Sequence, residues 1–97
     1  MAKIMRIVAD TQLAINVPIR ILGARLVHTG ATTCDIYDEV FSSTPTAAKK
    51  KIALATTTTV LSDDVILPAG GILFGTGCYI DWAAGELFLT VPDEYTV

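Results

Sequence analysis

The amino-acid sequence predicts an all-β protein, a single small β-sandwich or jelly-roll-like domain of about seven to eight short antiparallel strands. Short runs rich in apolar, β-branched and aromatic residues recur along the 97 residues, and several of them alternate with polar residues. Turn-forming residues separate these runs at spacings of about 8–12 residues, which is typical of sandwiches and jelly rolls. No long helical period appears in the chain. A chain of this length makes one domain, residues 1–97, and buries roughly 60–65% of the surface that its unfolded form exposes.

The first half of the chain contains four candidate strands. Pro18 marks a sheet edge or a bend between the second and the third, because proline cannot donate a backbone hydrogen bond. In the fourth, alternation places Cys34 and Ile36 toward the core and Tyr37 toward the outside. The candidate strands of this half are residues 4–8, 13–17, 19–28 and 32–40.

The second half begins with a loop composition and continues as strands. Alanines allow one helical turn near residues 46–50, whereas the threonines of residues 56–59 favour strand over a longer helix. Trp82 shares its alternation phase with Cys78 and Ile80, so its indole is expected in the core. The candidate strands of this half are residues 49–57, 60–67 with an expected break at residues 62–64, 71–74, 78–82 and 87–91.

Low charge and high apolar content indicate contact with a partner. Apolar residues make up 52% of the chain and charged residues 18%, against about 25% charged residues in an average soluble domain. The net charge is −3, and the basic cluster Lys49-Lys50-Lys51 is interpreted as a solvated strand start that protects a sheet edge. No nucleic-acid partner is therefore expected. Neither a secretory signal nor a membrane span is recognisable, so the protein is expected to remain in a cytoplasm or to leave it by cell lysis.

The residues that could carry chemistry do not form a recognisable catalytic or metal-binding motif. His28 is the single histidine of the chain, and its spacing to Cys34 and Cys78 matches no zinc pattern. Both cysteines lie on the apolar phase, so reduced core thiols are favoured, with a disulfide as the alternative. We therefore expect no catalytic residue, metal, cofactor or small-molecule substrate, and a protein that is not an enzyme.

Five residues are the candidate contacts with other proteins. Tyr37 and Tyr79 lie on outward phases, and exposed tyrosines are typical of protein interfaces. Residues 1–18 are a possible N-terminal arm that could pair with a neighbour's sheet edge, and residues 92–97 form a tail. The candidate interface residues are Ile4, Ile7, Tyr37, Tyr79 and Tyr95.

The order of the candidate strands forms a pattern of its own. A strand at residues 21–27 leads through a glycine turn into one at residues 34–38. An alanine-rich strand at residues 51–55 follows, and residues 71–80, GILFGTGCYI, form the closing signature. This succession resembles the small virion proteins of tailed bacteriophages, and the resemblance covers residues 19–91.

The resemblance implies a β-sandwich capsid decoration (cement) protein that binds the outer surface of the major capsid protein lattice and stabilises the shell. Its partners would be the major capsid protein and copies of itself, with a homotrimer favoured, and its location would be the virion. A tail, neck or head-fibre adaptor is the first alternative. A small carbohydrate-binding module is the second, although such a module needs more exposed aromatic residues than Tyr37 and Tyr79.

Overall fold

Ten strands and one short helical turn make up the described part of the computed structural model, which comprises residues 2–15, 18–40, 46–65, 67 and 70–92. The all-β prediction is confirmed, and the helix is the single 3-10 turn η1 (Ala47–Lys49), at the place predicted for it. The strands are β1 (Ala2–Ile7), β2 (Thr11–Ile15), β3 (Ile19–Ile21), β4 (Gly23–Val27), β5 (Thr32–Tyr37), β6 (Lys50–Thr56), β7 (Ser62–Val65), β8 (Ile72–Phe74), β9 (Gly77–Trp82) and β10 (Glu86–Pro92).

The ten strands exceed the predicted seven to eight and are one more than the nine candidate segments, because one candidate segment is divided. Residues 19–28 form two strands, β3 and β4, which are separated at Leu22. The backbone N–H of Leu22 donates to the carbonyl oxygen of Thr90 at 2.7 Å, so the chain passes from one sheet to another at this point. The buried residues are Ile19 and Ile21 before the break and Ala24 and Leu26 after it, so the alternation shifts by one residue where the chain changes sheet.

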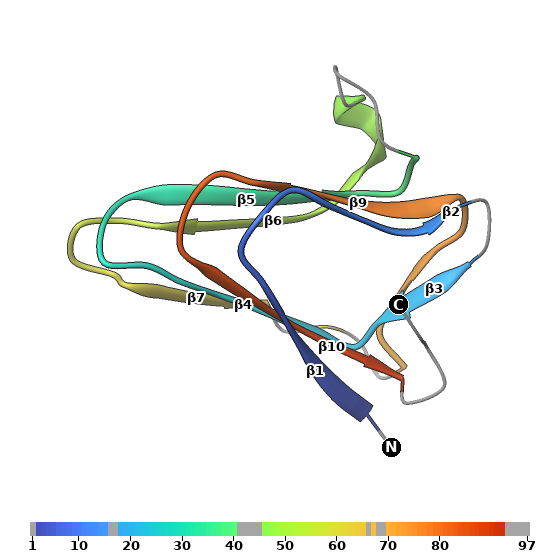
Figure 1. Ribbon diagram of the computed structural model, residues 1–97, viewed down its shortest axis with the longest axis horizontal. Helices are drawn as coiled ribbons and strands as arrows, with labels where there is room; N and C mark the ends of the chain where they lie inside the picture. Colours follow the sequence, from blue (N-terminus) through green and yellow to red (C-terminus); the bar gives the residue numbers. More distant parts are fainter. Residues whose placement is uncertain (1, 16–17, 41–45, 66, 68–69, 93–97) are drawn as a thin grey trace.

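Antiparallel pairs join the strands inward from the two ends of the chain. β1 pairs with β10, β2 with β9, β3 with β8, β4 with β7 and β5 with β6, so the chain is one long hairpin folded over on itself. Two further pairs, β10 with β4 and β9 with β5, close this ribbon into two four-stranded sheets. Their strand orders are β1-β10-β4-β7, called sheet A here, and β2-β9-β5-β6, called sheet B. This is the winding of a jelly roll, with β3 and β8 as an additional two-stranded ribbon at one end (Figure 1).

The core lies between the two four-stranded sheets and follows the alternation of the sequence. In β10, Leu87, Leu89 and Val91 are fully buried, while the residues between them are half-buried. Cys34 and Ile36 of β5 point into the core, as predicted from their phase. Burying these side chains is the main favourable contribution to the stability of the fold, at about 25 cal/mol for each Å² of apolar surface removed from water.

Most of the segment predicted as an N-terminal arm lies within the domain's own sheets. Each residue of β1 has a register partner on β10, and β2 pairs with β9. Ile7 is only 4% exposed and belongs to the core. The prediction of a separate arm is therefore corrected for residues 2–15. The two strands of this segment are edge strands, β1 of sheet A and β2 of sheet B. The tail predicted at residues 92–97 lies outside the described residues except for Pro92, which ends β10.

Candidate functional site

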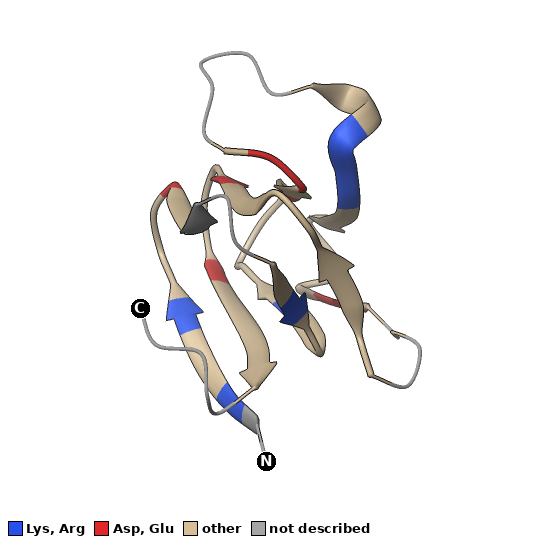
Figure 2. Ribbon diagram, turned by 90° about the vertical axis from the view of Figure 1, so that its right-hand side faces the viewer, with Lys and Arg blue, Asp and Glu red and all other residues tan. Residues whose placement is uncertain are grey.

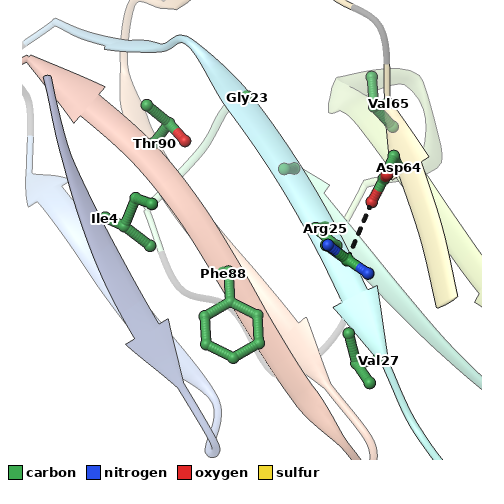
Figure 3. A pocket seen from close by; sticks show the side chains of 9 residues that line it. Ile4, Gly23, Arg25, Val27, Asp64, Val65, Phe88 and Thr90 are labelled. Atoms are coloured by element: carbon green, nitrogen blue, oxygen red, sulfur yellow. Dashed lines mark ion pairs between the residues drawn. The ribbon is translucent and has the colours of Figure 1, made fainter.

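The outer face of sheet A is the candidate functional surface. It consists of the outward side chains of four adjacent strands, called the outer A face here (Figure 3). Inward residues such as Leu87 and Leu89 alternate with them along β10. The outer A face comprises Ile4 and Arg6 of β1, Phe88 and Thr90 of β10, Gly23, Arg25 and Val27 of β4, and Asp64 of β7.

A hollow of about 500 Å³ lies in this face and opens to solvent. Its cause is Gly23, which sits opposite Thr90 in the register and contributes no side chain. Ile4 and Phe88 border the hollow, together with Val27 and Val65 (Figure 3). A Cβ at position 23 would make ordinary contacts with Thr90, the nearest at 3.5 Å, so the space can accept added atoms. The result is a shallow, largely apolar depression in an otherwise regular sheet.

Charged side chains flank the hollow in opposite-sign pairs. Arg6 of β1 donates to the Glu86 carboxylate, and Arg25 Nε lies 3.4 Å from Asp64 Oδ1. Exposed ion pairs of this kind add little stability, on the order of 0–1 kcal/mol each. The Arg25–Asp64 pair lines the hollow itself, and Arg6 faces Phe88 in the register. Paired charges therefore adjoin the apolar depression, as is common at the margins of protein–protein interfaces. Lysines gather elsewhere, at η1 and the start of β6 (Figure 2).

The candidate interface residues predicted from the sequence lie in different places. Ile4 is 70% exposed and lies on the outer A face, in line with its prediction as a surface contact. Ile7 lies in the core, so it does not offer a surface. Tyr37 and Tyr79 lie on the outer face of sheet B, and Tyr95 is outside the described residues.

Tyr37 and Tyr79 are buried, which corrects the prediction that they are exposed. They face each other across β5 and β9, their ring centroids are 6.3 Å apart, and they are 7% and 5% exposed. The ammonium group of Lys50 lies 5.9 Å from the Tyr37 ring. Alternation placed both rings outside the sandwich, but it could not show that the rings and the lysine cover one another. Burial raises the pKa of both phenols, and neighbouring carboxylates such as Asp35 and Asp10 add to that rise.

Trp82 lies at the border of the core. It faces Cys34 in the register, as its phase predicts, and packs against the core cluster while remaining half-buried. Its indole Nε1 donates to the carbonyl oxygen of Gly85 at 3.0 Å. Gly85 has a φ of 84°, and a Cβ there would lie 2.5 Å from a backbone oxygen. The indole therefore closes the β9–β10 turn and offers no broad aromatic platform to a sugar.

The two cysteines are free and buried, which is the favoured prediction. Cys34 lies opposite Trp82, four residues along β9 from Cys78, so the two Cα atoms are separated by roughly 13 Å along the strands. A disulfide requires less than about 7 Å. Burial, assisted by nearby carboxylates, raises the pKa of each thiol to about 12. Thiols in that state are poor nucleophiles.

Several carboxylates link separate chain segments by accepting hydrogen bonds from backbone N–H groups. Asp38 accepts the backbone N–H of Thr76 at 2.8 Å and lies 3.6 Å from Lys51 Nζ. Asp63 accepts the N–H of Ala55 at 2.9 Å and so links β7 to β6. Within the described residues, no three histidine, cysteine, aspartate or glutamate side chains form a group that could hold a metal ion.

The hollow was not predicted from the sequence, although the sequence contains one signal of it. A glycine inside a strand marks a bulge, a bend or the close approach of another chain. Gly23 sits at the start of β4, in the segment that was expected to be one long strand. The strand partners of Gly23 could not be known from the sequence, so neither could the neighbours that surround the hollow.

Comparisons of the chain with protein-family models, with curated proteins and with solved structures found no match. Among the residues that the structure describes, no helix has the length and apolar character that crossing a membrane requires.

Proposed function

We propose that this chain is a non-enzymatic virion structural protein of a tailed phage, a capsid decoration protein that binds the outer surface of the major capsid protein lattice and stabilises the shell. The outer A face is the observation that carries the proposal. It presents the exposed Ile4 and the hollow beside Phe88 within a rim of paired charges. A shallow apolar surface with a polar rim suits a protein partner better than a small substrate, which needs an enclosing pocket.

Repetition strengthens such a contact. A decoration protein occurs many times on one shell, and each copy then needs only a modest interface. A chain with few charges and a flat four-stranded face suits that role, since one face can rest on the lattice while the core remains intact. The inert thiols and the carboxylates bound to backbone N–H groups support a structural role over a catalytic one.

The test is cosedimentation with shells assembled from the major capsid protein encoded in the same genome. The variant Gly23→Glu fills the hollow with a charged side chain, and Gly23 does not have the positive φ that would strain it. We expect saturable binding by the wild type and binding at least about 10-fold weaker, about 1.4 kcal/mol, for Gly23→Glu.

Two matched variants serve as controls. Gly23→Ala adds one atom with ordinary contacts, and Leu73→Glu places the same charge at an exposed position of β8, away from the outer A face. Both should bind shells like the wild type. Absence of wild-type binding to shells would contradict the capsid proposal, and binding to purified tails instead would make the protein an adaptor. Equal binding by Gly23→Glu would show that another surface makes the contact.

A further inference from the structure

We propose that the exposed edge of β1 is an interface between two copies of this chain, which pair antiparallel about a two-fold axis at Ile4 and join their A sheets into one eight-stranded sheet. β1 is an outermost strand of sheet A, and no described strand pairs with its other side (Figure 3). Half of its backbone N–H and C=O groups therefore point away from β10. An edge of this kind is a template for another strand.

At Ile4, β1 lacks the features that usually prevent an edge strand from pairing with another chain. Proteins discourage edge pairing with charges, prolines, bulges or very short strands. β1 is six residues long and pairs with β10 without a bulge, and its middle carries Ile4, which is 70% exposed. Val60 is the next most exposed large apolar residue, at 56%, and it lies in a loop between strands. Ile4 is therefore the most exposed large apolar side chain of the described residues, and it stands on a strand edge.

The position of the two-fold axis decides which residues of the two β1 strands face each other, and the three possible positions can be compared by those pairs. A two-fold axis perpendicular to the sheet keeps outer residues with outer residues, so it must lie midway between one residue of β1 and the same residue of the second copy. An axis at Lys3 would set two lysines directly opposite each other, which is destabilising. An axis at Met5 would set Arg6 against Ile4 and Lys3 against Ile7, so Ile4 would face a charged side chain and the two copies of Ile4 would not meet. An axis at Ile4 sets isoleucine against isoleucine and leaves no like charges facing each other.

The remaining pairs of that register are also compatible. Arg6, which already binds Glu86 of its own chain, lies opposite position 2, an uncharged residue. Lys3 lies opposite Met5, whose flexible thioether can accommodate the lysine stem while the ammonium group reaches water. On the outer A face Ile4 faces Thr90 of its own chain on one side, and on the other side it would meet Ile4 of the second copy. The acidic residues that give the chain its net charge of −3 are absent from β1, so the contact avoids their repulsion.

The contact is small, and this determines its strength. Two six-residue strands meeting edge to edge form an interface at the low end of specific sizes, below about 1,200 Å² in total. We expect a weak dimer with a dissociation constant on the order of 10–100 μM. A two-fold contact of this kind closes at two copies, because the same strand is used on both sides. The dimer is a property of the isolated chain and does not depend on capsid binding.

Disulfide trapping tests the register. Ile4→Cys places two thiols directly opposite each other, at a Cα separation of about 4.5–5.5 Å that suits a disulfide. We expect Ile4→Cys to form a covalent dimer under mild oxidation at least about 10-fold faster than Lys3→Cys or Val60→Cys. Lys3→Cys probes the neighbouring residue on the same strand, and Val60→Cys measures random collision at an exposed site. The native cysteines are buried and give no background.

Sedimentation equilibrium from about 5 to 500 μM tests the dimer itself. The wild type should follow a monomer–dimer equilibrium, and Ile4→Asp should weaken it at least about 10-fold while circular dichroism stays unchanged. A monomer throughout that range, or a trimer, would overturn the proposal. Equal rates of crosslinking at positions 3, 4 and 60 would do the same. If Ile4→Asp dimerises normally but loses shell binding, Ile4 contacts the capsid protein and the two-fold interface is refuted.

Discussion

On the outer face of sheet B, Tyr37 and Tyr79 stack across the strands and Lys50 lies over one ring, whereas on the outer face of sheet A, Phe88 and Ile4 border a hollow that no described side chain fills. Both faces come from the same alternation of inward and outward residues. The difference lies in the cross-strand partners, because Tyr37 faces Tyr79 while Thr90 faces Gly23. Sheet B is covered by its own residues, whereas sheet A leaves apolar surface exposed to solvent.

The largest difference should appear when one large side chain is removed from each face. Tyr79→Ala removes a buried ring and leaves Tyr37 without its stacking partner, so we expect a loss of about 3 kcal/mol in the free energy of unfolding. Ile4→Ala removes an exposed side chain, and surface changes of this kind stay within about 0.5 kcal/mol. Urea unfolding of the two variants measures both values. Losses of equal size would show that the two faces do not differ in the way described.

Tyr79 also shows where prediction from the sequence ends. The alternation in β5 and β9 was sufficient to predict these strands and the core residues Cys34 and Cys78, because burial depends on the phase within one strand. The exposure of an outward residue depends on its neighbours across the sheet, and those are set by the register of distant segments. The hollow at Gly23 and the pairing of β1 with β10 required the fold of the whole chain for the same reason.

A second comparison concerns the carboxylates beside the two sheets. Burial tends to raise the pKa of Asp38, but the N–H groups of Thr76, Gly75 and Gly77 and the charge of Lys51 outweigh that effect and hold it below its ordinary value. Asp38→Asn should therefore lower the free energy of unfolding at pH 7 by about 1–2 kcal/mol, since hydrogen bonds to a charged group are lost.

The sign of the pH dependence follows from the lowered pKa. The folded protein holds the ionised Asp38 more favourably than the unfolded chain does, so the contribution is present above about pH 4 and disappears as the pH falls through the folded value. The gap between wild type and Asp38→Asn should narrow below pH 4. Asp64→Asn is the matched variant on sheet A, where the ion pair with Arg25 is exposed, and it should change stability by less than about 0.5 kcal/mol. A gap for Asp38→Asn that stays constant down to pH 2 would contradict this account.

The smallest expected effect comes from an unfavourable pair on the covered face of sheet B. Asp81 lies directly opposite Asp35 across β9 and β5. Burial raises the pKa of Asp81, the charges of Asp10 and Asp35 raise it further, and Lys50 opposes them. The ionised carboxylate is thus less favourable in the folded protein than in the unfolded chain. Asp81→Asn should stabilise the protein at pH 7 by about 0.5 kcal/mol, within the range for cross-strand pairs.

The pH dependence of this gain has the opposite sense to that of Asp38. A raised folded pKa means that the folded state binds the proton more tightly, so the cost of Asp81 is complete above the folded value and vanishes below the ordinary one. The advantage of Asp81→Asn should shrink toward zero as the pH falls to about 4 and below. Thermal unfolding of the wild type and the variant at several pH values measures it, with Asp64→Asn again as the exposed control. A loss of stability at pH 7 would mean that the charge of Asp81 is bound favourably on sheet B, and that the covered face tolerates its acidic residues better than the register suggests.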